Sequence, residues 1–259
     1  MLTLQQIEQQ YPEPERKFGR SLLREYLQCK ILAIIFTSNL ASKLSFLGGT
    51  ALRLIYGNNR FSEDLDFDNF GISSTEFADL AAQVRAGLEA YGFQTEVDVV
   101  GKNAYRCRVK LPGILYANDL SMNEEEKILI QIDSVAHDFS YVPDKTILNK
   151  FDVFSELSVT PLDILLAQKM YAAINRKRAK GRDFYDIVFL LSLTKPNYAY
   201  LQLKLGVGNG EELRTKLLSS IADFDFKELG QDVQPFLIDS ADIRKIELFP
   251  QFFKQVKLD

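Results

Sequence analysis

The segment from Phe46 to Asp68 constrains the fold and the chemistry of this chain more than any other. It predicts a strand that ends at Gly48 and Gly49, a short helix that begins at about Thr50, then a turn and a second strand. Glycines have no Cβ, so a phosphate can approach the backbone, and the free N–H groups at a helix start favour its negative charge. We therefore expect a phosphate-binding turn here.

Two carboxylates follow in the second strand, at Asp64 and Asp66. Alternate residues of a strand share a face, so these two lie side by side while Leu65 and Phe67 face the other way. Repulsion between such carboxylates raises their pKa unless a cation lies between them. Mg²⁺ accepts one or two carboxylates together with substrate phosphates. An isolated Asp-x-Asp is usually a solvated strand edge, but behind a glycine turn it predicts a metal and phosphate site.

Two motifs together resemble the signature of the DNA-polymerase-β-like nucleotidyltransferases: Gly48-Gly49-Thr50 and, after a spacer, Asp64-Leu65-Asp66. Their extended forms, Gly-Gly-Thr-Ala-Leu-Arg and the run from Arg60 to Phe67, resemble the AbiEii/AbiGii toxin branch more narrowly. The resemblance implies an α+β fold, in which a nucleotidyltransferase-type mixed sheet flanked by helices precedes a mainly helical C-terminal region. We expect the core domain at residues 1–155 and the helical domain, with Lys169, at residues 156–259.

The C-terminal half carries a lysine, Lys169, inside the apolar stripe of a helix predicted from about residue 160 to 177. Such a lysine either extends to the surface or faces a polar cavity. Asp183 and Asp186 share a face at the start of the next helix. Asp183 could merely cap that helix, and Asp186 could merely pair with Arg182. In this order, however, Lys169, the basic run from Asn175 to Arg182 and the segment Arg182-Asp183-x-x-Asp186 together resemble the third and fourth motifs of the AbiEii-type toxins.

The resemblance implies roles for these residues. Asp64 and Asp66 are the expected metal ligands, and Asp133, on another predicted strand, is the candidate third carboxylate. An Asp that only ends a strand explains Asp133 equally well. The catalytic candidates are Asp64, Asp66, Lys169, Asp183 and Asp186. Lys169 is expected to neutralise the triphosphate. Asp183 or Asp186 is expected to position or deprotonate the acceptor hydroxyl, or to hold Lys169 in place. The nucleotide-binding candidates are Gly48, Gly49, Thr50, Arg60, Ser62 and Lys169.

A basic cluster separates the two C-terminal helices. Its members are Arg176, Lys177, Arg178, Lys180 and Arg182. They are candidates for contacts with an RNA backbone, although a solvated turn has the same composition. The formal net charge of −4 provides no global attraction to nucleic acid, so RNA binding would need a local patch of this kind.

Other parts of the sequence predict the remaining framework. Helices are expected over about 18–42, 74–91, 211–221 and 240–249, a hairpin over 93–111 with its turn at 101–103, a strand over 127–133 and a short strand near 151–154. Arg106, Arg108 and Lys110 alternate onto one face of the hairpin. This face is either exposed to solvent or directed toward a phosphate.

Composition bounds the class of protein. The two cysteines, Cys29 and Cys107, fit buried thiols in a reducing cytosol, and the single histidine, His137, excludes a His-rich metal site. The start of the chain does not resemble a signal peptide, and no apolar run is long enough to span a membrane. We expect a cytoplasmic protein with no membrane partner.

The expected function is therefore Mg²⁺-dependent transfer of a nucleotide from an NTP to an acceptor hydroxyl, with release of pyrophosphate. The resemblance implies the toxin of a toxin–antitoxin system of the abortive-infection type, in phage defence. It also implies RNA as the acceptor, at the tRNA 3′ end, and a cognate antitoxin as partner. The alternatives are a nucleotidyltransferase acting on a small molecule or protein, and a non-catalytic NTP-binding module. A kinase is disfavoured because the sequence has no Gly-x-x-x-x-Gly-Lys-Ser/Thr loop.

Overall fold

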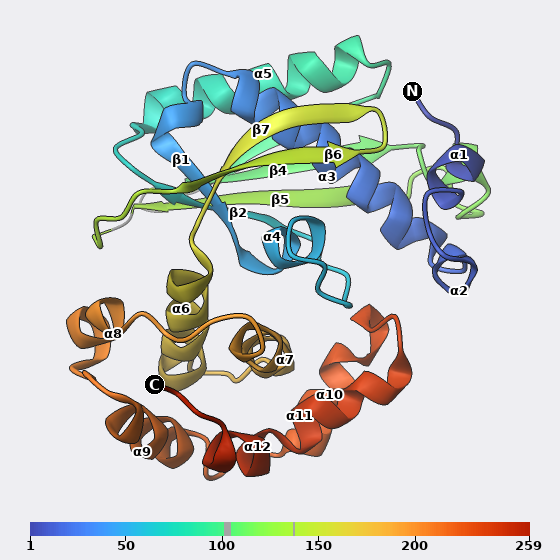
Figure 1. Cartoon of the computed structure of the whole chain (residues 1–259). Coiled ribbons are helices and arrows are strands. Elements are labelled where there is room, and N and C mark those ends of the chain that lie inside the picture. The colour runs from blue at the N-terminus through green and yellow to red at the C-terminus, as the bar shows by residue number, and fades with distance from the viewer. Residues whose placement is uncertain (101–104, 137) are drawn as a thin grey trace. The chain divides into compact units, whose positions relative to one another are not determined.

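The structure is a computed structural model that describes residues 1–100, 105–136 and 138–259 (Figure 1). The hairpin turn predicted at 101–103 and His137 lie outside the described residues. The chain forms two compact units: unit 1 comprises residues 1–55 and 62–159, and unit 2 comprises residues 56–61 and 160–259. Unit 2 therefore includes a six-residue segment, 56–61, that lies between the two N-terminal motifs in the sequence.

Unit 1 is built on a seven-stranded sheet in the order β3-β4-β5-β2-β1-β7-β6. The strands are β1 (Leu44–Leu47), β2 (Leu65–Asn69), β3 (Glu96–Val100), β4 (Tyr105–Pro112), β5 (Lys127–Ala136), β6 (Asp144–Lys150) and β7 (Val153–Val159). The central strand β2 runs antiparallel to β1 and parallel to β5. The sheet is therefore mixed, which confirms the predicted α+β fold.

Helices cover one face of this sheet (Figure 1). The helical elements of unit 1 are α1 (Leu4–Glu8), α2 (Glu13–Arg16), α3 (Gly19–Thr37), α4 (Gly48–Leu54) and α5 (Ser74–Ala90), with 3₁₀ turns η1 (Ala41–Lys43) and η2 (Tyr116–Asn118). The long helices α3 and α5 contact each other, and each packs on strands of the sheet. Every second residue of β4 and β5 is buried, so the alternating Arg106 and Arg108 belong to the other, open face.

The prediction of one short strand near 151–154 was wrong. Residues 144–159 form the hairpin β6–β7, and Phe151, with φ +57°, lies in its turn. In β7 the buried positions alternate at Val153, Ser155 and Leu157. A serine at a buried position weakens the apolar alternation by which a strand is found in a sequence, and this explains the error.

Unit 2 is helical. Its elements are α6 (Leu162–Asn175), α7 (Gly181–Leu191), α8 (Tyr198–Leu205), α9 (Gly210–Ser220), α10 (Phe226–Val233), α11 (Arg244–Glu247) and α12 (Phe249–Gln255), with 3₁₀ turns η3 (Gln234–Phe236) and η4 (Ser240–Ile243). Phe184 of α7 lies 4.8 Å from Phe249, centroid to centroid, in the aromatic core. The prediction of a single helix over 240–249 was wrong, because three short pieces, η4, α11 and α12, replace it. Pro250 lies in the first turn of α12, where its fixed φ is tolerated.

Candidate active site

The glycine motif and the Asp-x-Asp motif meet in unit 1. Leu47, the last residue of β1, is the strand partner of Asp66, and α4 begins at the next residue, Gly48. The φ of Gly48 is +81°, and a Cβ built there would lie 2.3 Å from Oδ2 of Asp66. A glycine is therefore required at this position both for its backbone conformation and for the room that it leaves to the carboxylate.

Replacement of this glycine is expected to damage the site and the fold together. Gly48→Ala should lower the free energy of unfolding by about 1–3 kcal/mol, because the left-handed backbone becomes strained, and should displace the Asp66 carboxylate. Gly71 is the matched control, since it also has a positive φ, +89°, but its Cβ would meet nothing within 4 Å. Urea unfolding and a nucleotide-incorporation assay would compare them. Equal activity of the two variants would contradict this account of Gly48.

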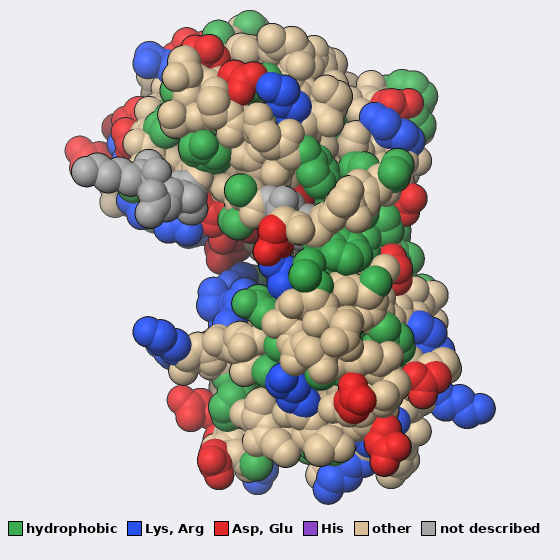
Figure 2. Space-filling view, turned by 90° about the vertical axis from the view of Figure 1, so that its left-hand side faces the viewer, with side chains coloured by type: hydrophobic (Ala, Val, Ile, Leu, Met, Phe, Trp, Pro, Cys, Tyr) green, Lys and Arg blue, Asp and Glu red, His purple; other side chains and the backbone are tan. Residues whose placement is uncertain are grey.

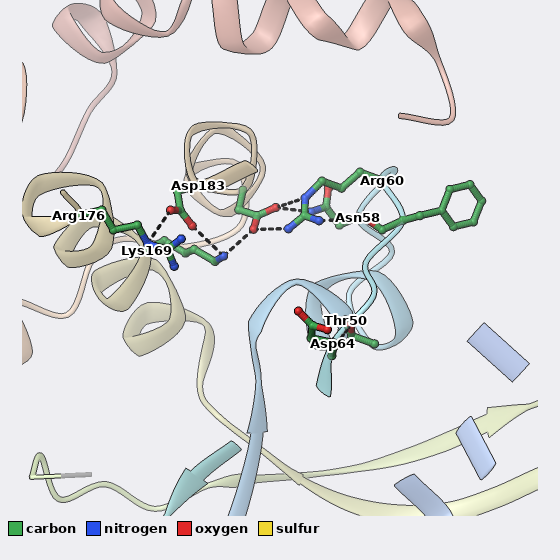
Figure 3. Close-up of polar contacts among 9 residues, drawn as sticks. Thr50, Asn58, Arg60, Asp64, Lys169, Arg176 and Asp183 are labelled. Atoms are coloured by element: carbon green, nitrogen blue, oxygen red, sulfur yellow. Dashed lines mark hydrogen bonds and ion pairs between the residues drawn. The ribbon is translucent and has the colours of Figure 1, made fainter. Parts of the chain in front are cut away.

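Buried polar contacts fix α4 and the approach to β2. The Thr50 hydroxyl, which is fully buried, donates to the carbonyl oxygen of Asp64 (Figure 3). The side-chain amide of Gln28 donates to the carbonyls of residues 62 and 63, at 3.0 Å each. On α4 itself, Arg53 pairs at 2.6 Å with Glu25 of α3, a carboxylate that is almost completely buried. The hydroxyl of Thr50 thus has a structural partner, which sequence reasoning did not foresee.

Asp133 lies beside Asp66 on the sheet. The two residues are Cα partners in the parallel β2–β5 pair, and Arg106 on β4 is opposite Asp133. The Asp133 carboxylate accepts from Arg106 Nε at 2.7 Å and from Gln131 Nε2 at 2.9 Å. The hydrogen bond from Arg106 to Asp133 raises the pKa of Arg106, and the negative charges of Asp133, Asp64 and Asp66 raise it further. The predicted hairpin strip therefore contributes one arginine to the surroundings of the carboxylates.

The donor set suits a magnesium ion that also binds phosphate. No group of three or more His, Cys, Asp or Glu side chains in the described ranges is placed to hold a metal ion. Asp133 in particular is engaged with Arg106. Asp64 and Asp66, both half-buried next to the glycine turn, supply the one or two carboxylates that Mg²⁺ uses when waters and phosphates complete its shell.

In unit 2 a second polar cluster forms around Asp186, which is completely buried. Arg60, from segment 56–61, donates to both oxygens of this carboxylate, from Nε at 2.7 Å and from Nη2 at 2.6 Å. Asn58 donates a further hydrogen bond at 3.0 Å, and Lys169 Nζ lies 2.9 Å away (Figure 3). Asp186 therefore ties the six-residue segment to the helices of unit 2.

Asp183 holds the other side of Lys169. Its Oδ1 lies 3.2 Å from Lys169 Nζ, and its Oδ2 lies 3.3 Å from Arg176 Nε (Figure 3). Lys169 thus lies between two carboxylates, those of Asp183 and Asp186. The structure places Asp186 with Lys169 and Arg60, and not with Arg182 as the sequence also allowed.

The charges of this cluster stabilise one another. Burial would raise the pKa of Asp186, but Arg60 and Lys169 lower it to about 2. Burial would likewise lower the pKa of Lys169, but Asp186 and Asp183 raise it above its usual value. Asp186 is therefore ionised and Lys169 protonated at neutral pH. A fully engaged carboxylate with so low a pKa is a poor general base.

The predicted RNA-contacting residues gather at the connection between α6 and α7. Lys177, Arg178 and Lys180 are exposed, Arg176 pairs with Asp183, and the Arg182 guanidinium lies 5.0 Å from the centre of the Phe236 ring.

Basic and acidic side chains are interspersed in both units on the face drawn in Figure 2. This mixture agrees with the small net charge.

Two of three solved structures of similar fold are described as nucleotidyltransferases. MenT4, the nucleotidyltransferase toxin Rv2826c from Mycobacterium tuberculosis H37Rv, matches with a TM-score of 0.59 and 17% identity, over 99% of this chain and 91% of that one. A putative nucleotidyltransferase from H. pylori matches with a TM-score of 0.55 and 20% identity, over 90% and 94%. JHP933 from Helicobacter pylori gives 0.53 and 18%, over 90% and 91%. The fold is thus that of nucleotidyltransferases.

The sequence defines the family. Residues 30–249 match the family described as nucleotidyl transferase AbiEii toxin, Type IV toxin–antitoxin system, and the chain belongs to this family. It is therefore a nucleotidyltransferase of toxin type, which confirms the predicted family and enzyme class. A comparison with curated proteins finds no match. Among the helices in the described ranges, none has both the length and the apolar character needed to cross a membrane.

Proposed function

We propose that this enzyme is a Mg²⁺-dependent toxin that transfers a nucleoside monophosphate from an NTP to the 3′-terminal hydroxyl of tRNA. The observation that carries the proposal is the fit of Gly48 against the Asp66 carboxylate, because it sets a glycine turn suited to phosphate beside a pair of carboxylates suited to Mg²⁺. Transfer to RNA in particular is supported by the exposed basic residues between α6 and α7.

In the reaction, the acceptor hydroxyl loses its proton to solvent and its oxygen forms a bond to the α-phosphorus. The bond from that phosphorus to the bridging oxygen breaks, and pyrophosphate leaves. Backbone N–H groups at Gly48 to Thr50 would bind phosphate oxygens. Asp64 and Asp66 would hold the metal, which when bound neutralises charge on the attacking and leaving oxygens. Lys169 would contribute positive charge toward the phosphates.

Asp183 and Asp186 are proposed as positioning residues. Both oxygens of Asp186 accept from Arg60, and each oxygen of Asp183 lies near one cation. These contacts fix Lys169 and segment 56–61, and they leave the two carboxylates unsuited to removing a proton. Arg60, which is 2% exposed, is assigned here to the same framework and not to direct contact with the nucleotide.

The acceptor is tested with α-labelled NTPs and deacylated tRNA. We expect label at tRNA size for at least one NTP, and loss of that label when EDTA removes Mg²⁺. Periodate oxidation of the 3′-terminal ribose destroys the proposed acceptor hydroxyl, so oxidised tRNA should not be labelled. Equal labelling of oxidised tRNA would disprove transfer to the 3′ end. Label on a small molecule or on protein instead would support the alternative acceptors.

The family also implies a cognate antitoxin. We propose that co-expression of the antitoxin relieves growth inhibition by this protein, and that growth inhibition requires the same Asp66 as transfer. An Asp66→Asn variant that still inhibits growth would separate toxicity from nucleotidyl transfer.

A further inference from the structure

A small cavity of about 210 Å³ opens in unit 2, where the connection between α6 and α7 meets the end of α10 and η3. Five side chains give it its chemical character: Arg178, Lys180, Arg182, Asp232 and Phe236. The proposed reaction at the two aspartates of unit 1 does not use this cavity.

Two arginines at the cavity, Arg178 and Arg182, have no carboxylate partner among the described residues. The guanidinium of Arg182 lies over the ring of Phe236, 5.0 Å from its centre. Within the described ranges, neither Arg178 nor Arg182 has a carboxylate at ion-pair distance, whereas Arg60, Lys169 and Arg176 nearby in unit 2 all do. An anion would provide the missing partner, and an arginine held against an aromatic ring forms a platform on which a planar group stacks.

The opposite wall is acidic. Asp232 lines this cavity and also an adjoining one of about 220 Å³, whose lining adds Asp223, Asp225 and Glu228. A phosphate is excluded from that wall by repulsion, but a group that carries N–H donors is favoured there. A nucleotide combines both requirements, because it joins a phosphate to a base, and the bases other than uracil present an exocyclic amino group.

We propose that this cavity binds one unpaired nucleotide of the acceptor RNA. The base stacks on the Arg182–Phe236 pair, its amino group donates to Asp232, and the neighbouring phosphates contact Arg178 and Lys180. Single strands are recognised in this way, by stacking of splayed bases and hydrogen bonds to their edges. The inference rests on the proposed RNA acceptor, and it adds that cytidine is favoured over uridine, because uracil has no amino group for Asp232.

Binding of fluorescent hexamers of cytidine and of uridine, measured by anisotropy without NTP, tests the proposal. The cytidine hexamer should bind more tightly, and Asp232→Ala should make the two equal. Phe236→Leu should weaken binding roughly five- to hundredfold, the range for loss of one stacked base, and Phe236→Tyr should restore it. Recovery in Phe236→Tyr shows that position 236 tolerates substitution.

Salt dependence separates charge from stacking. Arg178→Ala should reduce the slope of log K against log salt by about 0.7, the value for one phosphate contact with a single strand, whereas Phe236→Leu should leave the slope unchanged. Arg244→Ala, an exposed arginine elsewhere in unit 2, is the matched control and should alter neither slope nor affinity.

The proposal would be overturned if the variants Phe236→Leu and Arg178→Ala bound the hexamers as tightly as the unmodified protein does. It would also be overturned if the unmodified protein bound the cytidine and uridine hexamers equally, or bound neither. If tRNA is still labelled in any of these cases, the proposed function stands without this cavity. The expected hexamer binding without any labelling would support the cavity and contradict the function.

Discussion

Asp66→Asn is expected to reduce nucleotidyl transfer by at least about 10²–10³-fold, the scale on which loss of one group that stabilises transition-state charge slows a reaction. The amide keeps the size of the carboxylate against Gly48 but removes the charge of a proposed metal ligand. The fold should persist, because asparagine has the shape of the aspartate that it replaces. Single-turnover incorporation and urea unfolding measure the two effects.

Asp79→Asn is the matched control for this substitution. Asp79 is exposed on α5 of the same unit, so its loss of charge should leave both transfer and stability unchanged. Transfer by Asp66→Asn within a few-fold of the unmodified enzyme would show that the glycine turn and the Asp-x-Asp strand are not the catalytic centre.

Asp186→Asn is expected to produce the largest loss of stability. The free energy of unfolding should fall by about 3–5 kcal/mol, because the substitution leaves the buried Arg60 without its carboxylate partner and leaves Lys169 with Asp183 alone. Both side chains are largely buried, so water replaces the lost carboxylate poorly. Urea unfolding measures the change, and Asp223→Asn, at an exposed position of unit 2, should change stability by less than about 0.5 kcal/mol.

The pH dependence of stability follows from the same carboxylate. The pKa of Asp186 falls to about 2 in the folded protein, below its value of about 3.9 when unfolded. Its contribution is therefore complete above about pH 4 and is lost as the pH falls toward 2. The unmodified protein should lose stability over this window more steeply than Asp186→Asn. Equal acid sensitivity of the two proteins would contradict the assigned ionisation.

Local patterns made much of the fold and the first motif predictable. The glycine turn, the strand β2, which begins one residue after Asp64 and contains Asp66, and the α5 capping box of Ser73 and Glu76 each involve residues that are close in the sequence. Their physical signals are strand alternation, glycine conformation and side-chain capping, all of which are visible in a short window.

Contacts between residues that lie far apart in the sequence could not be predicted. Arg60 meets Asp186 across 126 residues, so no local pattern indicated that segment 56–61 belongs to the helical unit. The same holds for Arg106 and Asp133, whose pairing depends on the order of β4 and β5 in the sheet. The hydrogen bond from the buried Thr50 hydroxyl was missed for a related reason. A threonine at a helix start next to glycines suggests a phosphate ligand, whereas its actual partner, the carbonyl of Asp64, lies 14 residues further along the chain.

The central claim is that the two aspartates of unit 1 transfer a nucleotide to RNA. The most direct measurement follows NTPs labelled at either the α- or the γ-phosphorus, with Mg²⁺ and deacylated tRNA, for the unmodified enzyme and for Asp66→Asn. The account predicts α-label in tRNA and γ-label in pyrophosphate, with neither product formed by the variant. Transfer of the γ-label to RNA, or unchanged α-labelling by Asp66→Asn, would contradict it.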